Sequence, residues 1–513
     1  MADARSSCRR AFRAVALAAA ALAGCAGQPP PERELRVALS EDLPSFDPQA
    51  WNTVGAYQVL SSVYEPLVRL DRSLRPVPAL AVSWENPDVL TWVFRLRAGV
   101  RFHDGSPFSS EDVVASLRRL LADESLGMRS FVSGVAEVEA RGEDTVIVRT
   151  VRPNTQLASR LHFVLIVPRG STSASLARRA NGTGPYAVAG WSPPSLRLVR
   201  HAEYWGEPPG LARVRIDMGM VSDAAAQSVA EGLYDVVEAA RRTEGAARRS
   251  GHYQMLEQEN IFLRHLAFDV ERERTPFCPG ISNPFRRPEV REAVSLALDR
   301  RQLAATAGPG ARPADQLVPQ SVFGHDSRLL PIEPDPARAR ALLARAGLAR
   351  GFDVVLHRGG FAAAAELVKA QLAEVGIRVR VEAMPPVGFF EALEHRELSF
   401  WILASGSATG DGLELLEESF HSPGPGGLGV HNYGGYREPE MDREILVAGT
   451  LFDLRRRQET VKRLLGKALA DRPWIPLYYD RGALAIARGL RYEPRADGYL
   501  WVAGVRPDRE SSR

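Results

Sequence analysis

Hydrophobic and polar positions along the chain follow two periods, one of two residues and one of about 3.6 residues. Residues 35–40 form an apolar run that predicts a buried strand. Residues 138–150 alternate on both sides of Gly142–Glu143, which predicts a hairpin. Residues 91–103 also predict a strand, whose apolar face carries Trp92, Phe94 and Leu96. The N-terminal part of the chain therefore predicts short strands joined by tight turns.

A strand, a helix and a second strand follow one another over residues 352–384, which predicts a parallel pair with a helical crossover. Gly376 stands where this helix should end. Residues 335–347 predict another helix, with Asp335 as its N-cap, and residues 288–300 predict a third. The chain has 513 residues, of which 45% are hydrophobic, enough for more than one packed core. We therefore expect an α/β fold in at least two lobes.

The stretch GVRFHDGSPFSSEDVVASL (residues 99–117) gathers groups that could form a metal or acid/base site: His103, Asp104, Glu111 and Asp112. Asp104-Gly105 is also a turn dipeptide, and Ser109 with Asp112 three residues later fits a capping box. A metal site would need further ligands at regular spacing, and no histidine pair of the sequence forms H-x-x-x-H. We interpret the stretch as a strand, a turn and a capped helix.

Motifs of common enzymes are missing from the sequence. It has no G-x-S-x-G elbow, and Gly466-Lys467 is followed by Ala468, so there is no phosphate-binding loop. Cys278 has no neighbour that would activate a thiolate. We expect a protein that is not an enzyme and needs no cofactor or metal.

The first residues resemble a bacterial export signal. Four arginines precede the apolar run AVALAAAALAG, and LAGC at residues 22–25 resembles a lipobox, which implies cleavage before Cys25 and lipidation of its thiol. Residues 1–24 carry the whole net charge of +3, so the processed chain would be neutral, with no electrostatic case for nucleic acid. We expect a lipoprotein of the cell envelope that faces the periplasm and is a monomer, without a choice between inner and outer membrane.

Several segments, in order along the chain, resemble the extracellular solute-binding proteins of ABC importers, the peptide/nickel type (family 5). They include VYEPLVRLD, LRPVPALAVSWE, the stretch of residues 99–117, NGTGPYAVAGW, EYWGEPP, FRRPEVREAVSLALDRRQL, DPARARALLARAG and HNYGGYREPEMDREI. The resemblance implies a periplasmic-binding-protein-like type II fold, whose two lobes close on a ligand by hinge motion. It also implies a subdomain inserted in the first lobe, and a permease and an ATPase as partners.

The resemblance divides the chain into consecutive parts. They are a signal peptide (1–24), a lipidated tether (25–34), three pieces of lobe I (35–64, 183–265 and 480–513), the inserted subdomain (65–182) and lobe II (266–479).

Peptide-binding members of the family carry an acidic residue that pairs with the amine of the ligand, and here that position is Ala408. We hypothesise that Asp411 or Asp269 supplies the contact, although either could instead be a helix cap or a hinge bond. Peptide is therefore a default ligand and not a conclusion, and the ligand is a peptide or a similar small organic solute. Backbone groups and aromatic walls should line the cleft, and the predicted ligand-binding residues are Phe46, Tyr64, Phe268, Asp269, Trp401, Ser405, Gly406, Ser407 and Asp411.

Two alternatives remain open from the sequence. The same cleft could serve an envelope sensor or chaperone that has no permease. An envelope hydrolase would be favoured only if His103 faces a carboxylate in a cleft.

Overall fold

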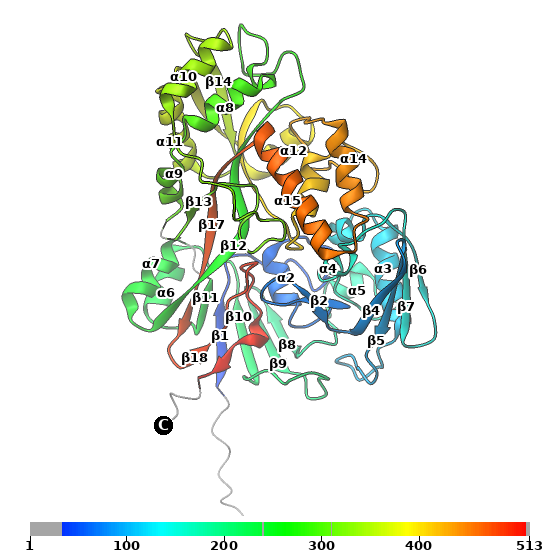
Figure 1. The fold of residues 1–513 in the computed structure, drawn as a ribbon. Coiled ribbons are helices and arrows are strands. Elements are labelled where there is room, and N and C mark those ends of the chain that lie inside the picture. Colours follow the sequence, from blue (N-terminus) through cyan, green and yellow to red (C-terminus); the bar gives the residue numbers. More distant parts are fainter. Residues whose placement is uncertain (1–32, 239–240, 309, 509–513) are drawn as a thin grey trace, which may run out of the picture.

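The computed structural model describes residues 33–238, 241–308 and 310–508, so the predicted signal peptide and Cys25 lie outside the described residues (Figure 1). One large sheet runs through the molecule in the strand order β15-β14-β16-β12-β17-β11-β1-β10-β9-β8, and β13 pairs with β17 at one side. Its strands are β1 (Glu34–Ala38), β8 (Tyr186–Ser192), β9 (Ser195–Arg200), β10 (Arg213–Asp217), β11 (Val236–Glu238), β12 (Tyr253–Phe268), β13 (Arg312–Pro313), β14 (Phe352–Arg358), β15 (Ile377–Ala383), β16 (Phe400–Ser405) and β17 (Trp474–Ala487).

Two long strands, β12 and β17, join the two lobes. They pair antiparallel, with a register shift between Glu259 and Leu263. On one side of this shift β17 pairs with β11 of lobe I, and on the other side β12 pairs with β16 of lobe II. Figure 1 shows both strands running from the lower lobe into the upper one. The predicted lobe boundaries at residues 266 and 480 fall within these strands and stay predictions.

The sheet of lobe II is buried on both faces because its side chains alternate between two cores. Phe400 and Ile402 of β16 belong to one core, whereas Trp401 and Leu403 belong to the other. The first core is covered by α8 (Pro288–Leu296), α9 (Arg300–Ala307), α10 (Pro336–Arg345) and α11 (Ala362–Ala373). The second is covered by α12 (Pro386–Glu394), α13 (Gly412–Leu415), α14 (Pro439–Ala448) and α15 (Leu454–Asp471).

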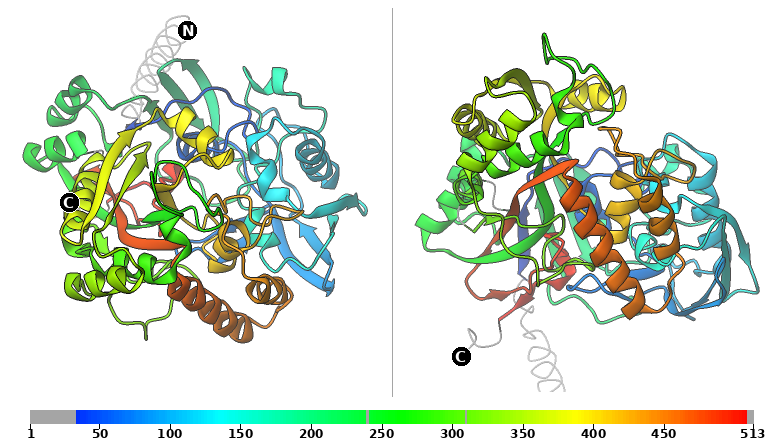
Figure 2. Two further views of the ribbon diagram at one scale, coloured as in Figure 1. Left: turned by 90° about the horizontal axis from the view of Figure 1, so that it is seen from above. Right: turned by 45° about the horizontal axis from the view of Figure 1, so that its top comes forward.

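A separate antiparallel sheet, in the order β4-β5-β7-β6, lies within the segment predicted as the inserted subdomain. Its strands are β4 (Ala81–Asp88), β5 (Thr91–Leu96), β6 (Val135–Ala140) and β7 (Thr145–Thr150), and α3 (Ser110–Ala122) contributes to the same core. This unit lies at the right of Figure 1, beside the ends of α14 and α15, and Figure 2 shows the same neighbourhood from two further directions. The predicted hairpin of residues 138–150 is confirmed as β6 and β7.

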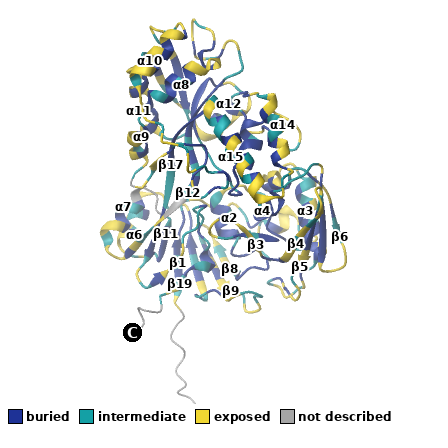
Figure 3. Cartoon of the chain, viewed as in Figure 1, coloured by how far each residue is buried: buried dark blue, intermediate teal, exposed yellow. Residues whose placement is uncertain are grey.

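The remaining elements are short and lie mostly around lobe I. Figure 3 shows that the central strands are buried and that exposed residues gather on the outer helices. The short elements are α2 (Val54–Leu60), β2 (Val68–Leu70), β3 (Pro76–Pro78), α4 (Leu157–Arg160), α5 (Ser173–Leu176), α6 (Asp223–Ala230), α7 (Arg241–Ser250), β18 (Leu490–Arg491) and β19 (Arg506–Pro507), with single turns at Gly127–Val132, Pro284–Arg286, Leu416–Phe420 and Val502–Gly504.

The predicted strand–helix–strand unit is confirmed as β14, α11 and β15, and the two strands pair in parallel. The Asp335 side chain caps α10 by accepting a hydrogen bond from the Arg338 N–H at 2.9 Å. The helix predicted over residues 288–300 is instead two helices. Asp299 interrupts it because its carboxylate accepts from the N–H groups of Arg301 and Gln302 and so starts α9.

The structure confirms the turn and the capped helix within residues 99–117. The strand predicted over residues 91–103 is wrong beyond Leu96, where β5 ends, because the chain turns at Gly99 with a φ of +76°. Gly105 has a φ of +84°, which residues with a side chain rarely adopt, and the Ser109 N–H donates to Asp112 Oδ2 at 2.8 Å.

His103 bonds only to backbone: Nε2 donates to the Gly184 carbonyl at 3.0 Å, and Nδ1 accepts from the Gly182 N–H at 3.4 Å. Burial lowers the pKa of His103 to about 4, so the ring is neutral and is held in one tautomer.

Candidate ligand-binding cleft

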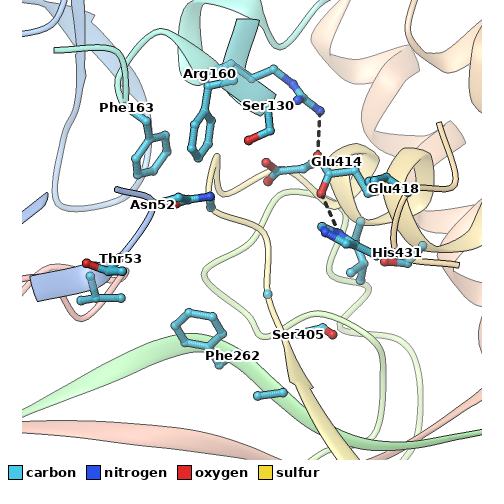
Figure 4. Close-up of a pocket in the computed structure, with 18 of the residues that line it drawn as sticks. Asn52, Thr53, Ser130, Arg160, Phe163, Phe262, Ser405, Glu414, Glu418 and His431 are labelled. Atoms are coloured by element: carbon cyan, nitrogen blue, oxygen red, sulfur yellow. Dashed lines mark hydrogen bonds and ion pairs between the residues drawn. The ribbon is translucent and has the colours of Figure 1, made fainter. Parts of the chain in front are cut away.

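A cavity of about 400 Å³ lies between the two lobes, where α2, α4 and the turn at Gly127–Val132 face β16 and α13 (Figure 4). A small organic ligand fits a cavity of this size. From the side of lobe I and the inserted subdomain it is lined by Asn52, Thr53, Val54, Tyr57, Met128, Ser130, Phe131, Arg160, Phe163 and Tyr499. From the joining strand β12 it is lined by Phe262, and from lobe II by Phe390, Leu403, Ala404, Ser405, Gly406, Ala408, Glu414, Leu415, Glu418, Ser419, Val430, His431 and Tyr433.

Aromatic rings from both lobes form much of the cavity wall. They leave backbone accessible where β16 ends, at Ser405 and Gly406. A Cβ at Gly406 would lie 3.0 Å from the Ile261 carbonyl oxygen and from the Phe262 ring, so a side chain here would press against β12. The rings are Tyr57, Phe131, Phe163 and Tyr499 from lobe I and the inserted subdomain, Phe262 from the joining strand β12, and Phe390 and Tyr433 from lobe II.

Glu414 is the first carboxylate of the polar end of the cavity. Its Oε2 accepts hydrogen bonds from Ser407 Oγ at 2.8 Å, from the Thr409 N–H at 3.0 Å and from Thr409 Oγ1 at 2.9 Å. Burial and the charge of Glu418 raise the pKa of Glu414 to about 7, although Arg160 opposes the shift. Figure 4 shows this carboxylate pointing into the cavity, on the side where Arg160 and Ser130 lie.

Glu418 is the second carboxylate and is paired on both oxygens. Oε1 lies 3.4 Å from Arg160 Nη2, and Oε2 lies 3.4 Å from His431 Nδ1. Burial opposes its ionisation, but the hydrogen bond with His431 and the charge of Arg160 hold the pKa of Glu418 below its usual value. The hydrogen bond with Glu418 and its negative charge raise the pKa of His431, although burial alone would lower it.

A third carboxylate, Glu417, is held by residues that precede it by more than 250 positions. Arg152 Nη1 donates to Oε1 at 3.0 Å, while Gln156 Nε2 and Arg160 Nη2 lie 3.3 and 3.5 Å from Oε2. We call these five residues, Arg152, Gln156, Arg160, Glu417 and Glu418, the lobe latch, because they join the inserted subdomain to lobe II. Nearby, Arg457 Nη1 donates to the Thr155 carbonyl at 3.3 Å. The lobes therefore touch through buried polar groups, as expected of a closed form.

The backbone after α13 explains how neighbouring carboxylates reach different partners. Residues Leu416–Phe420 continue α13 as a π-type turn. Such wide turns change the direction of side chains within a helix and recur at functional sites. Here Glu414 faces the cavity, while Glu417 and Glu418 face arginines of the inserted subdomain.

Among the nine predicted ligand-binding residues, the structure brings Ser405 and Gly406 to the cavity wall. Ser407 lies behind the wall and holds Glu414. Asp411 also lies behind it: Oδ1 caps α13 through the Leu413 N–H, and Oδ2 pairs with Arg457 Nη2 at 3.1 Å. The helix-cap alternative for Asp411 therefore describes the observed geometry.

The predicted aromatic contacts lie in hydrophobic cores instead of at this cavity. Phe268 and Trp401 belong to strands covered on both faces, so each ring enters one of the two cores of lobe II. Phe46 and Tyr64 belong to the core of lobe I, where the Phe46 ring lies 4.6 Å from that of Trp191. Asp269 is 1% exposed and accepts from Arg272 Nε at 2.6 Å, which organises the loop after β12.

The charged residues of the cavity were not among those predicted from the sequence: Arg160, Glu414, Glu418 and His431. A signal for two of them was present, because Glu414 and Glu418 are four residues apart in the run GLELLEESF, and such a spacing places two carboxylates on one helical face. Arg160 and His431 come close to them only through the tertiary fold, and no local pattern marks them.

Comparison with known proteins places the chain in a family. Residues 75–427 match the bacterial extracellular solute-binding proteins, family 5. The glutathione-binding protein GsiB of Escherichia coli O1:K1 / APEC is 26% identical over 518 residues, covering 95% of this chain and 96% of GsiB.

Solved structures share the whole fold at low sequence identity. HbpA2 from Haemophilus parasuis superimposes with a TM-score of 0.80 at 20% identity, over 93% of this chain and 100% of HbpA2. The periplasmic binding protein DppA from Helicobacter pylori, in complex with the peptide STSA, gives 0.77 at 19% identity, over 93% and 98%. Among the described residues, no helix combines the length and the hydropathy needed to span a bilayer. The family match covers more than half of the sequence, and the chain therefore belongs to the family 5 solute-binding proteins of ABC importers.

Proposed function

We propose that this protein captures a peptide or a peptide-like small solute between its lobes and delivers it to an ABC permease driven by a separate ATPase. The observation that carries the proposal is the cavity itself. Its wall comes from both lobes, and the lobe latch closes beside it. A ligand that touches both walls stabilises the closed form by its differential affinity for the two states.

The cavity supports a ligand with both polar and apolar parts. Aromatic rings form one region of the wall, and Arg160, Glu414, Glu418 and His431 form another. GsiB is a glutathione-binding protein, and DppA was solved with a peptide. A peptide-like solute offers amide groups to the backbone at Ser405 and Gly406, an amine to a carboxylate, and apolar side chains to the rings.

The N-terminal segment supports a membrane-anchored form. The LAGC sequence favours lipidation at Cys25, and the following proline-rich residues would hold the folded part away from the membrane. We place the protein in the cell envelope as a periplasm-facing lipoprotein that acts as a monomer.

Binding without catalysis is the proposed activity. His103 was the residue on which a hydrolase would have depended, and both of its ring nitrogens bond to backbone groups. A sensor or chaperone that uses the same cleft is the second candidate, and recovery of a crosslinked permease distinguishes an importer from both.

The test is native mass spectrometry of the gently purified protein, followed by reconstitution with its permease and ATPase. We expect a retained solute that contains peptide or peptide-like bonds, and stimulation of ATP hydrolysis by the loaded protein. A loaded protein that leaves ATP hydrolysis unchanged would overturn the transport function.

A further inference from the structure

Two opposite charges line the polar end of the cavity without touching each other. Arg160 belongs to α4 of the inserted subdomain, and Glu414 belongs to α13 of lobe II. They interact electrostatically, since each shifts the pKa of the other. No ion pair within 4.0 Å joins them, although such pairs join Arg160 to Glu417 and Glu418. Both side chains line the same cavity, so a ligand bound there lies close to both charges.

Each of these groups keeps polar atoms that no described residue engages. The hydrogen bonds of the Glu414 carboxylate all end on Oε2, and Oε1 has no partner among the described residues. The hydrogen bond of Arg160 to Glu418 and its nearest contacts with Glu417 and Glu418 use Nη2, and Nη1 makes no hydrogen bond to another described residue. Both side chains are more than nine-tenths buried, and a ligand that reaches these two atoms in the cavity forms charge-assisted hydrogen bonds with them.

The other charged residues of the wall are already paired. Glu418 uses one oxygen for Arg160 and the other for His431. Among the lining residues, the region of Tyr57, Phe262, Phe390 and Tyr433 contains no Lys or Arg. Arg160 is therefore the guanidinium of the cavity wall that can bind a ligand carboxylate. It lies at the same end of the cavity as Glu414, which can bind the ligand ammonium.

From this geometry we infer that the cavity recognises an α-amino acid head, with the ammonium on Glu414 Oε1, the carboxylate on Arg160 Nη1 and an uncharged body against the aromatic rings. A γ-glutamyl or similarly linked amide has such a head, because both charges sit on one carbon. An ordinary linear peptide separates its two charged ends by the length of its backbone. The inference rests on the proposed function and narrows its ligand class.

The same contacts explain how a small ligand could favour closure. The head bridges a carboxylate of lobe II and a guanidinium of the inserted subdomain, so both bonds form only when the lobes are together. The bridge lies next to the lobe latch and shares Arg160 with it.

Two isomers test the inference by isothermal titration calorimetry: the γ-anilide and the α-anilide of L-glutamate. They have the same composition, charges and aromatic ring, but only the γ-anilide keeps ammonium and carboxylate on one carbon. We expect the γ-anilide to bind at least about tenfold more tightly, the effect of one charge-assisted hydrogen bond. Equal binding, tighter binding of the α-anilide, or binding of neither would overturn the inference.

Two arginine variants test whether Arg160 causes the difference in affinity between the two anilides. Arg160→Met should bring the ratio of the two affinities close to one. Arg152→Met is the matched control, because Arg152 also bonds to Glu417 but does not line the cavity, and it should keep the ratio. A ratio that survives Arg160→Met in protein that keeps its wild-type circular dichroism would contradict the assignment. A protein that binds linear peptides and stimulates its permease without preferring the γ-anilide would lose this inference and keep the proposed function.

Discussion

Two stretches of this chain look alike in sequence and have different roles. Residues 99–117 and 400–418 each lead through small and polar residues into a helix that carries carboxylates. In the first, Asp104 accepts from Ser106 and Asn181, and Asp112 accepts from the backbone of Ser109 and Arg169, all within the inserted subdomain. In the second, Glu417 and Glu418 bond to arginines on the other side of the cleft.

The role of a carboxylate in these two stretches depends on whether its bonding partners lie in the same part of the fold or across the cleft. A carboxylate that bonds to its own turn or helix end fixes local backbone, and its loss is a local loss of stability. A carboxylate that bonds across the cleft contributes only when the lobes are closed, so it links ligand binding to lobe position. Matched substitutions in the two stretches test this distinction by comparing their effects on ligand affinity and on stability.

The largest effect is expected from Glu417→Ala. The substitution removes a buried carboxylate that contacts three residues of the inserted subdomain. The positive charges of Arg152 and Arg160 then lose one of the negative charges that balance them. Breaking a buried pair costs about 3 kcal/mol, so ligand affinity should fall about 100-fold by calorimetry. Asp112→Ala is the control: it should lower the unfolding free energy by about 1 kcal/mol and leave the affinity unchanged. Equal effects of the two variants on affinity would remove the distinction.

A change of about tenfold is expected from pH. The pKa of Glu414 is raised to about 7, mainly by burial, so the folded protein holds this proton over a range in which the unfolded chain has lost it. The contribution of Glu414 to stability therefore falls as pH rises from about 4.5 to about 7. Affinity for a ligand with an ammonium group should increase from about pH 6 to about pH 8, because Glu414 must ionise to bind it.

Calorimetry across this pH range, with two variants, assigns the effect to Glu414. His431, Glu418 and Arg160 face the same space, and Glu417 lies behind them. Glu414→Gln should therefore remove most of the rise without removing these groups. Asp104→Asn should leave the rise intact, because Asp104 bonds to Ser106 and Asn181 away from the cavity and has a lowered pKa. A rise that persists in Glu414→Gln would assign it to another group.

A smaller effect is expected from Asp411→Asn. The side chain caps α13 and pairs with Arg457, which in turn bonds to the Thr155 carbonyl across the cleft. Asn keeps the cap but loses the charge, so affinity should fall by roughly threefold through weaker closure. A complete loss of binding would favour a direct contact between Asp411 and the ligand.

No effect on binding is expected from His103→Ala. The ring bonds to the backbone at Gly182 and Gly184, so its removal should cost about 1–2 kcal/mol of stability and leave the affinity within twofold. Chemical denaturation and calorimetry measure the two quantities separately. A large loss of affinity with unchanged stability would return His103 to the candidate site.

Local patterns in the sequence predicted the elements well. Asp335, Ser109 and Asp112 have the capping roles expected of them, and β14, α11 and β15 form the predicted parallel unit, because these features depend on neighbouring residues. The cleft was predicted less well. In a sheet that is buried on both faces, the spacing of apolar residues does not show whether an aromatic side chain lies in a core or lines the cleft. Phe268 and Trp401 were predicted to line the cleft, and both lie in cores.

Small-angle X-ray scattering of the wild type with and without its retained solute tests the central claim most directly. We expect a smaller radius of gyration for the wild type with the solute bound. Glu417→Ala mixed with the solute should keep a radius close to that of the empty wild type. The same radius in the presence and absence of a solute that calorimetry shows to be bound would contradict the central claim.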